Sequence, residues 1–192
     1  MSDITVTELI KSRRTIRKFQ QKAIDVSLLR QFTDAARLAP SGANLQPLKY
    51  IIVESRNMTD RLFEHVKWAG YLAPHYNPKE DERPRAYIVV CADKTIRENG
   101  YDMDVGAAAE NIILSALSYG VGCCWMASID RDKIRGLLNV CDNLEISCVL
   151  ALGYPKEEPK EVEYKGDVKY YLDGKTLCVP KRSMEEVLVD IF

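Results

Sequence analysis

The sequence predicts a single domain of the α+β class, with helices and strands interspersed along the chain. Its 192 residues suit one domain with a substantial core. Two short runs of β-branched and aromatic residues, "KYIIVE" at 49–54 and "AYIVVC" at 86–91, predict central strands covered on both faces. Apolar residues at helical spacing predict a long helix over 102–119. No internal repeat and no linker divides the domain, which is predicted to span 1–192.

The N-terminal part is predicted to hold two helices. The "TVTE" pattern of Thr5 to Glu8 is that of a capping box, so a short helix should run from it to about Arg13. A second helix should begin after a cap at Asp25 or Ser27. It should end before Pro40, because proline disfavours helical backbone in the residue that precedes it.

The long apolar helix predicts contact with a second subunit. The run "DMDVGAAAENIILSALSY" is apolar around most of its circumference and is ended by Gly120. In a chain of this size, such a helix is buried more easily if another copy covers one face. The small residues from Gly106 to Ala109 would allow close approach, so a homodimer is predicted.

The rest of the body is predicted to continue as strand, helix and strand. "GCCWM" at 122–126 and "EISCVLALG" at 145–153 predict the strands, and Asp130 caps the helix between them. "SMEE" at 183–186 repeats the capping-box pattern near the C-terminal end.

Two segments are predicted to be irregular. Residues 64–85 are rich in proline, glycine and charge, which predicts a lid-like excursion. Residues 155–192 are predicted to form a C-terminal arm, which crosses the body or a partner. The part at 155–180 is polar, and it has too little apolar content for a core of its own.

The charge balance argues against two classes of partner. With 27 basic and 28 acidic residues, the chain has no overall field that would attract nucleic acid or a membrane surface. The N-terminus lacks the pattern of a signal peptide, and no run approaches roughly 18 apolar residues. The chain is therefore predicted to be soluble and cytoplasmic.

No metal site is predicted from the cysteines. They form no C-x-x-C pair and have no histidine at zinc-finger spacing. Most lie in apolar runs, so we interpret them as small buried hydrophobic residues, with thiol chemistry as the alternative. The six are Cys91, Cys123, Cys124, Cys141, Cys148 and Cys178.

A local excess of cations is the first candidate binding site. The stretch "SRRTIRKF" at 12–19 holds Arg13, Arg14, Arg17 and Lys18. Such cations can simply complement the dipole at a helix C-terminus and remain solvated. The alternative is a phosphate site, because arginine offers a planar fork that matches phosphate oxygens and Thr15 adds a hydroxyl donor.

Two further patterns are compatible with a ligand or with an ordinary surface. Lys181 and Arg182 precede the last capped helix, and they would complete a phosphate clamp if the arm returns to the first cations. The loop "APSGANLQP" at 39–47 could be a simple turn. Its uncharged polar side chains also suit the edge of a planar heterocycle. They are Ser41, Asn44 and Gln46.

Five segments carry a resemblance over nearly the whole chain. They are "SRRTIRKF", "AARLAPSGANLQPLKYIIV", "DVGAAAENIILSALSYGVGCCW", "VLALGYP" and "VPKR". In this order and spacing, the chain resembles the FMN-dependent nitroreductase family. The resemblance implies an α+β nitroreductase-like fold, in which helices flank a central mixed, mainly antiparallel sheet. It also implies an intertwined homodimer.

The resemblance further implies that FMN is bound where the two subunits meet. The family's contacts with the phosphate and ribityl chain correspond to Arg13, Arg14, Thr15, Arg17, Lys181 and Arg182. The loop that approaches the flavin from the other subunit corresponds to Pro40, Ser41, Gly42, Asn44 and Gln46. The segment against the isoalloxazine, with a backbone N–H for flavin N5, corresponds to Met126, Ala127 and Ser128. Family members often have glycine near this point, which this chain lacks.

The activity that the resemblance implies is that of an NAD(P)H-dependent oxidoreductase. Hydride passes from the nicotinamide to flavin N5, and a small acceptor such as a nitroaromatic or a quinone then takes the electrons. No catalytic side chain is predicted, because the cofactor supplies the reactivity. Trp68 and Tyr71 are candidates for an aromatic wall beside the substrate, although aromatic residues in a lid also pack it onto the body.

Two other functions would use some of the same residues. A flavin-binding protein without turnover, such as a sensor or carrier, would use the same contacts and is the alternative. A nucleic-acid-binding module based on Arg13 to Lys18 is disfavoured, because the stretch has neither a recognition motif nor interleaved aromatic residues.

Overall fold

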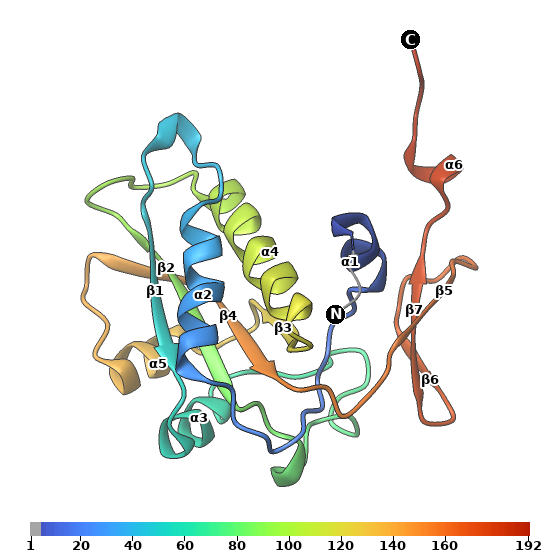
Figure 1. The fold of residues 1–192 in the computed structure, drawn as a ribbon, viewed down its shortest axis with the longest axis horizontal. Coiled ribbons are helices and arrows are strands. Elements are labelled where there is room, and N and C mark those ends of the chain that lie inside the picture. Colours follow the sequence, from blue (N-terminus) through green and yellow to red (C-terminus); the bar gives the residue numbers. More distant parts are fainter. Residues whose placement is uncertain (1–4) are drawn as a thin grey trace.

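The computed structural model describes residues 5–192 and is built around a four-stranded antiparallel sheet with the order β1-β2-β4-β3 (Figure 1). The strands are β1 (Leu48–Val53), β2 (Ala86–Asp93), β3 (Gly122–Met126) and β4 (Leu144–Gly153). Strand β2 is buried along nearly its whole length, as its apolar sequence predicts.

Helices cover both faces of this sheet. On one face, α2 (Val26–Arg37) and α4 (Asp102–Ser118) pack against Ile88 and Val90 of β2. On the other face, α3 (Arg56–Phe63) and α5 (Arg131–Leu138) share a core with Tyr87 and Val89. The alternation follows from the two-residue period of a strand. The predicted α+β fold, with helices flanking an antiparallel sheet, is confirmed.

The predicted helix caps are also in place. Helix α1 (Val6–Ser12) begins with a capping box, in which the side chains of Thr5 and Glu8 each accept a hydrogen bond from the other residue's backbone N–H. Asp25 caps α2, since its carboxylate accepts a hydrogen bond of 2.7 Å from the Ser27 N–H.

Two elements differ from the sequence expectation. Strand β1 was expected to be central, but it lies at the sheet edge, where Tyr50 and Ile52 are only partly buried. A β-branched run is compatible with either position. No helix was expected at 56–63, yet α3 forms there. Its two turns bury only Thr59 and Leu62, which is too short a pattern to reveal a helical period.

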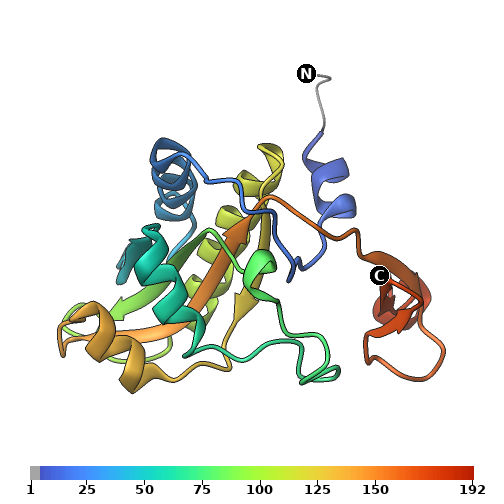
Figure 2. The same ribbon diagram turned by 90° about the horizontal axis from the view of Figure 1, so that it is seen from below.

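The C-terminal arm contains a second sheet, which corrects the prediction of an irregular segment at 155–180. Strands β5 (Lys160–Glu163), β6 (Tyr171–Asp173) and β7 (Thr176–Lys181) pair in the order β5-β7-β6. Strands β5 and β6 are short and mostly exposed, so they show little alternation of apolar and polar residues, whereas β7 buries Leu177 and Cys178. Helix α6 (Met184–Val187) follows with its predicted capping box. The arm lies to one side of the body, beyond α1 (Figures 1 and 2).

Between α3 and β2 the chain is irregular over 64–85, apart from a single 3₁₀ turn, η2 (Glu80–Glu82). Its apolar side chains Ala69 and Tyr76 pack with Leu177 of β7, so this segment touches the arm. Within 5–192, no helix has the length and apolar character needed to cross a membrane.

The cysteines behave as small hydrophobic residues. Cys141 is exposed, whereas the other five are buried, and all six are free thiols. Burial raises the pKa of the Cys91 and Cys124 thiols to about 11, and that of Cys148 to about 12. These thiols remain protonated near neutral pH, which disfavours thiol chemistry at the buried positions.

Candidate functional site

Residues 12–19, called the cationic segment here, pack against the end of the sheet where β3 begins and β4 ends. Ile16 and Phe19 face inward and are buried, Phe19 completely. The Ile16 N–H donates to the Cys123 carbonyl at 3.0 Å, and the Phe19 N–H donates to the Glu82 carbonyl at 2.9 Å. The charged residues between these two anchors remain partly exposed.

Two glycines allow this close packing. Gly122 and Gly153 lie directly opposite each other in the pairing of β3 with β4. A Cβ atom at Gly122 would lie 2.6 Å from Ile16 Cγ1, and one at Gly153 would lie 2.7 Å from Phe19 Cδ1. Both distances are far below van der Waals contact, so the segment can lie this close only because neither position has a side chain.

Each arginine of the cationic segment has partners within the chain, and the side-chain partners of all three are weak. Arg14 Nη1 also donates to the backbone carbonyls of Lys11 and Arg13. Arg13 Nε lies 3.7 Å from Glu110 of α4, and Arg14 pairs with Glu161 of β5. The two glutamate side chains are 44% and 52% exposed, and ion pairs so exposed contribute little stability. The Arg17 guanidinium lies 4.5 Å from the centre of the Tyr170 ring. These arginines can therefore be recruited by a more strongly charged anion.

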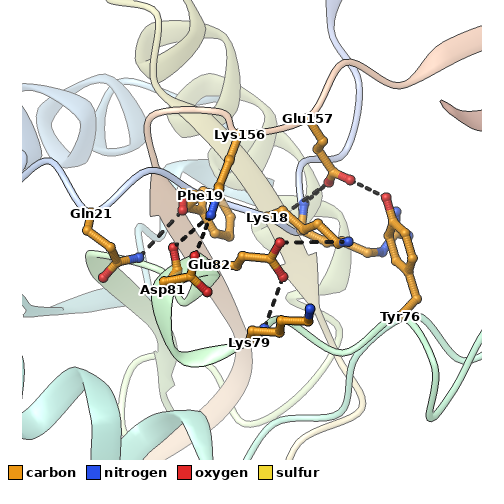
Figure 3. Close-up of polar contacts among 10 residues, drawn as sticks. Lys18, Phe19, Gln21, Tyr76, Lys79, Asp81, Glu82, Lys156 and Glu157 are labelled. Atoms are coloured by element: carbon orange, nitrogen blue, oxygen red, sulfur yellow. Dashed lines mark hydrogen bonds and ion pairs between the residues drawn. The ribbon is translucent and has the colours of Figure 1, made fainter. Parts of the chain in front are cut away.

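Glu157 ties the cationic segment to the arm and to the irregular region (Figure 3). Its carboxylate accepts hydrogen bonds from the backbone N–H groups of Arg17 and Lys18 and from the Tyr76 hydroxyl. Burial and the hydrogen bond to Glu157 both raise the pKa of Tyr76, so this hydroxyl remains a donor at neutral pH. Lys18 lies 4.4 Å from the centre of the Tyr76 ring.

Removing the Glu157 carboxylate is expected to loosen three segments at once. In Glu157→Ala, the N–H groups at 17 and 18 and the Tyr76 hydroxyl lose their common acceptor, at a cost of about 2–3 kcal/mol. Amide hydrogen exchange should accelerate at Arg17 and Lys18 and over 69–82 and 160–163. The exposed neighbour offers a matched control, Glu158→Ala, which should leave exchange unchanged. Equal exchange in both variants would remove Glu157 from this role.

The second basic pair lies in the arm. Lys181 ends β7, and Arg182 stacks on Tyr164 at 4.3 Å and pairs with Glu186 at 3.3 Å. Strand β7 pairs with β5, whose Glu161 contacts Arg14. The arm thus joins the basic pair to the cationic segment through neighbouring strands, although the two sets of cations are not in direct contact.

The polar loop lies elsewhere. Its 3₁₀ turn η1 (Gly42–Asn44) follows α2, at the upper left of Figure 1, whereas the arm lies at the right. The loop borders a groove of about 740 Å³ between α2 and β1, which Pro40, Ser41 and Gln46 help to line. Within residues 5–192 of a single chain, this loop does not lie beside the cationic segment.

The third predicted group ends strand β3. Met126 is buried, whereas Ala127 and Ser128 are exposed. The Ser128 carbonyl accepts a hydrogen bond of 3.0 Å from the Lys67 N–H, which ties the irregular region to this strand end.

The two aromatic candidates of the irregular region differ in exposure. Trp68 is only 5% exposed and stacks on Phe63 with ring centres 5.5 Å apart, which favours a packing role. Tyr71 is 56% exposed, and its ring lies 4.9 Å from that of Tyr170. Of the two, Tyr71 is the one accessible to a ligand.

Comparison with known proteins decides the family. The model of the nitroreductase family matches residues 10–154, which include the cationic segment, the polar loop and all four strands of the main sheet. The chain belongs to the nitroreductase family.

Relatives and solved structures agree with this membership. A protein of Archaeoglobus fulgidus, named provisionally as an NADH dehydrogenase/NAD(P)H nitroreductase, is 35% identical over 79% of this chain and 86% of its own. The crystal structure of a nitroreductase family protein from Clostridium novyi has a TM-score of 0.66, with 31% identity over 80% of this chain and 88% of its own. A provisionally named nitroreductase of Desulfovibrio desulfuricans, crystallised with FMN, has the same fold, with a TM-score of 0.71 at 21% identity over 99% and 98% of the chains.

Two residues that fix the candidate segments of this nitroreductase family member were not predicted from its sequence. One is Glu157, which is surrounded by other charges in the sequence and carries no signal of its own. The other is Asp104, a buried carboxylate on α4. It shares a helix face with the buried Ala108 and Ile112, and a charge on an otherwise apolar face is a signal that could have been used.

Proposed function

We propose that this nitroreductase family member is an FMN-dependent oxidoreductase that takes hydride from NAD(P)H and passes electrons to a small acceptor, such as a nitroaromatic or a quinone. The observation that carries the proposal is the arginine set of the cationic segment. Arg13, Arg14 and Arg17 lie beside the buried Ile16 and Phe19, and the acidic side chains that pair with Arg13 and Arg14 are largely exposed. Such a set suits a phosphate of about −1.5 to −2 charges.

The donor groups fit the two ends of FMN. Arg13, Arg14, Thr15 and Arg17, together with Lys181 and Arg182 of the arm, would bind the phosphate and ribityl chain. The uncharged loop from Pro40 to Gln46 and the strand end at Met126 to Ser128 would bind the ring. Bound FMN supplies the hydride-accepting and hydride-donating centre at N5. The protein orients the ring and controls access to it, and Tyr71, whose side chain is exposed, would contact the acceptor.

We further propose that two copies complete each site. The loop and the cationic segment lie apart in one chain, so a ring held by one and a phosphate held by the other require a second subunit. Gly106 and Ala107 of α4 are only partly buried within the chain, which leaves a small-residue surface for close approach. At the end of the arm, Val189 and Ile191 are 97% and 80% exposed, as expected of a segment that packs on a partner.

The first test is the visible absorption spectrum of the purified protein, followed by anaerobic addition of NADH and then NADPH. We expect flavin bands that bleach with one or both nucleotides and return when an acceptor is added. Bound flavin that never bleaches would favour the sensor or carrier alternative. A colourless protein that cannot be reconstituted with FMN would overturn the proposal.

A further inference from the structure

Among residues 5–192, Asp104 is the one carboxylate that is buried, and its side chain points toward the polar loop. It lies in the first turn of α4 and is 5% exposed. Its oxygens accept hydrogen bonds from the Ser41 hydroxyl at 2.7 Å and from the Gly42 N–H at 3.1 Å. Arg97 Nη1 lies 3.6 Å away. A buried carboxylate is costly unless it is paired in this way, so the arrangement needs an explanation.

The loop that Asp104 holds has an unusual backbone. Ala43, Asn44 and Gln46 all have positive φ angles, of 52°, 54° and 52°. Residues with a Cβ rarely adopt this conformation, and it persists only where the surrounding structure imposes it. Three such residues within four positions require contacts from the rest of the protein that hold the loop in this conformation. Such strain is typical of functional sites.

The Ser41 hydroxyl transmits the constraint across the loop. It donates to Asp104 and at the same time accepts a hydrogen bond of 3.0 Å from the Gln46 N–H. The Gln46 side chain then donates to Asn44 Oδ1 at 3.1 Å. One carboxylate therefore fixes both ends of the loop, and the exposed side chains of Asn44 and Gln46 are held in a defined arrangement.

Arg97 fixes the carboxylate from the other side. Its Nε donates to the Asn99 carbonyl at 3.0 Å, so the guanidinium does not depend on Asp104 alone for its position. A Cβ atom at Gly42 would lie 2.6 Å from Arg97 Nη1, so a side chain at this position would have to displace the guanidinium. Burial acts to raise the pKa of Asp104, but the hydrogen bonds from Ser41 and Gly42 and the charge of Arg97 outweigh it and lower that pKa.

We infer that Asp104, held by Arg97, is a positioning residue that shapes the Ser41–Gln46 loop for its contact with the flavin ring. The inference rests on the proposed function, and it narrows the set of loop residues that contact the flavin ring. The Ser41 hydroxyl hydrogen is committed to Asp104, so Ser41 belongs to the support of the loop. Asn44 and Gln46, whose side chains are exposed, make the ring contacts.

The test compares Asp104→Asn with Asp102→Asn in the full chain. Asp102 lies in the same first turn but is exposed, so its variant controls for the lost charge near the helix N-terminus. In the apoprotein, amide exchange over 41–46 should accelerate by about tenfold or more in Asp104→Asn only. FMN affinity, measured by fluorescence quenching, should fall by about tenfold. Asp104→Glu, which keeps the charge, should recover part of both properties.

A double-mutant cycle separates positioning from a general loss of stability. Ser41→Ala removes the hydrogen bond that Asp104→Asn weakens by taking the charge from its acceptor, so their effects on FMN affinity should be clearly less than additive. Asn44→Ala should weaken FMN binding, while the N–H groups of Gly42 and Gln46 keep their acceptors, Asp104 and Ser41, and stay protected from exchange. If Asp104→Asn does not fold, Ser41→Ala carries the same exchange measurement.

The outcomes distinguish this inference from the proposed function. If the wild-type protein binds FMN and Asp104→Asn matches it in loop exchange and in affinity, the inference is wrong and the proposed function stands. Additive effects in the cycle would also overturn the inference. If the wild-type protein binds no FMN, the proposed function fails and the role of the loop in flavin binding fails with it.

Discussion

Replacing Arg13 and Arg17 together by alanine is expected to release FMN from an otherwise folded protein. A hydrogen bond between a guanidinium and a phosphate contributes about 1.5–3 kcal/mol, so losing two of them should weaken FMN binding by about 10²- to 10⁴-fold. The fold should survive, because the segment is anchored by Ile16 and Phe19, which remain in place. Arg13 and Arg17 leave behind only an exposed glutamate and a tyrosine ring.

The measurement is the FMN dissociation constant, with circular dichroism and gel filtration to follow folding and oligomeric state. A matched control is Arg61→Ala with Lys133→Ala, which removes two exposed positive charges from α3 and α5. The control should bind FMN normally, since long-range charge effects are screened at physiological salt. Stoichiometric flavin in the double Arg13 and Arg17 variant would defeat the phosphate assignment.

Much of the architecture could be predicted because local signals and the final fold agree. The capping boxes at Thr5 and Ser183 and the cap at Asp25 mark helix starts through hydrogen bonds made within one turn. Strand β2 is recognisable because both of its faces are buried. In these elements the residues that determine the structure lie close together in the sequence.

The missed features depend on contacts between distant residues. The edge position of β1 is decided by which strands pair, and the arm strands are stabilised by one another and by the packing of Leu177 on Tyr76. Asp104 gains its role from Ser41, which lies far from it in the sequence. The cations at 12–19 were predicted as a site from their spacing, but the close packing of their segment on the sheet depends on the glycine pair of β3 and β4.

Substituting the second glycine of that pair is expected to be strongly destabilising. In Gly153→Ala, the new methyl group would lie 2.7 Å from Phe19 Cδ1 and 2.8 Å from Phe19 Cβ. Phe19 is fully buried and cannot turn away into solvent, so overpacking should cost about 2–3 kcal/mol. For a chain of this length, the melting temperature should fall by about 4–10 °C. Urea denaturation followed by circular dichroism measures the change.

A control on α5 shows whether the steric clash is responsible. Gly136 lies in a helix interior with nothing within 4 Å of a new Cβ, so Gly136→Ala should raise stability by about 0.5–1 kcal/mol. The same methyl group is thus expected to have opposite effects at the two positions. A Gly153→Ala variant as stable as the wild type would show that Phe19 is free to shift.

The Gly153 variant should also lose FMN, although Gly153 is not among the predicted flavin contacts. Moving Phe19 displaces the backbone that carries Arg17, because only one residue separates them. In a Phe19→Leu background the contact with the ring is relieved while the contact with the Cβ atom of residue 19 remains, so the penalty of Gly153→Ala should shrink in part for both stability and FMN affinity. Loss of stability with unchanged FMN affinity would mean that the arginines keep their place independently of the sheet. Coupled loss and coupled recovery would show that the packing of Phe19 on Gly153 sets the position of the phosphate-binding arginines.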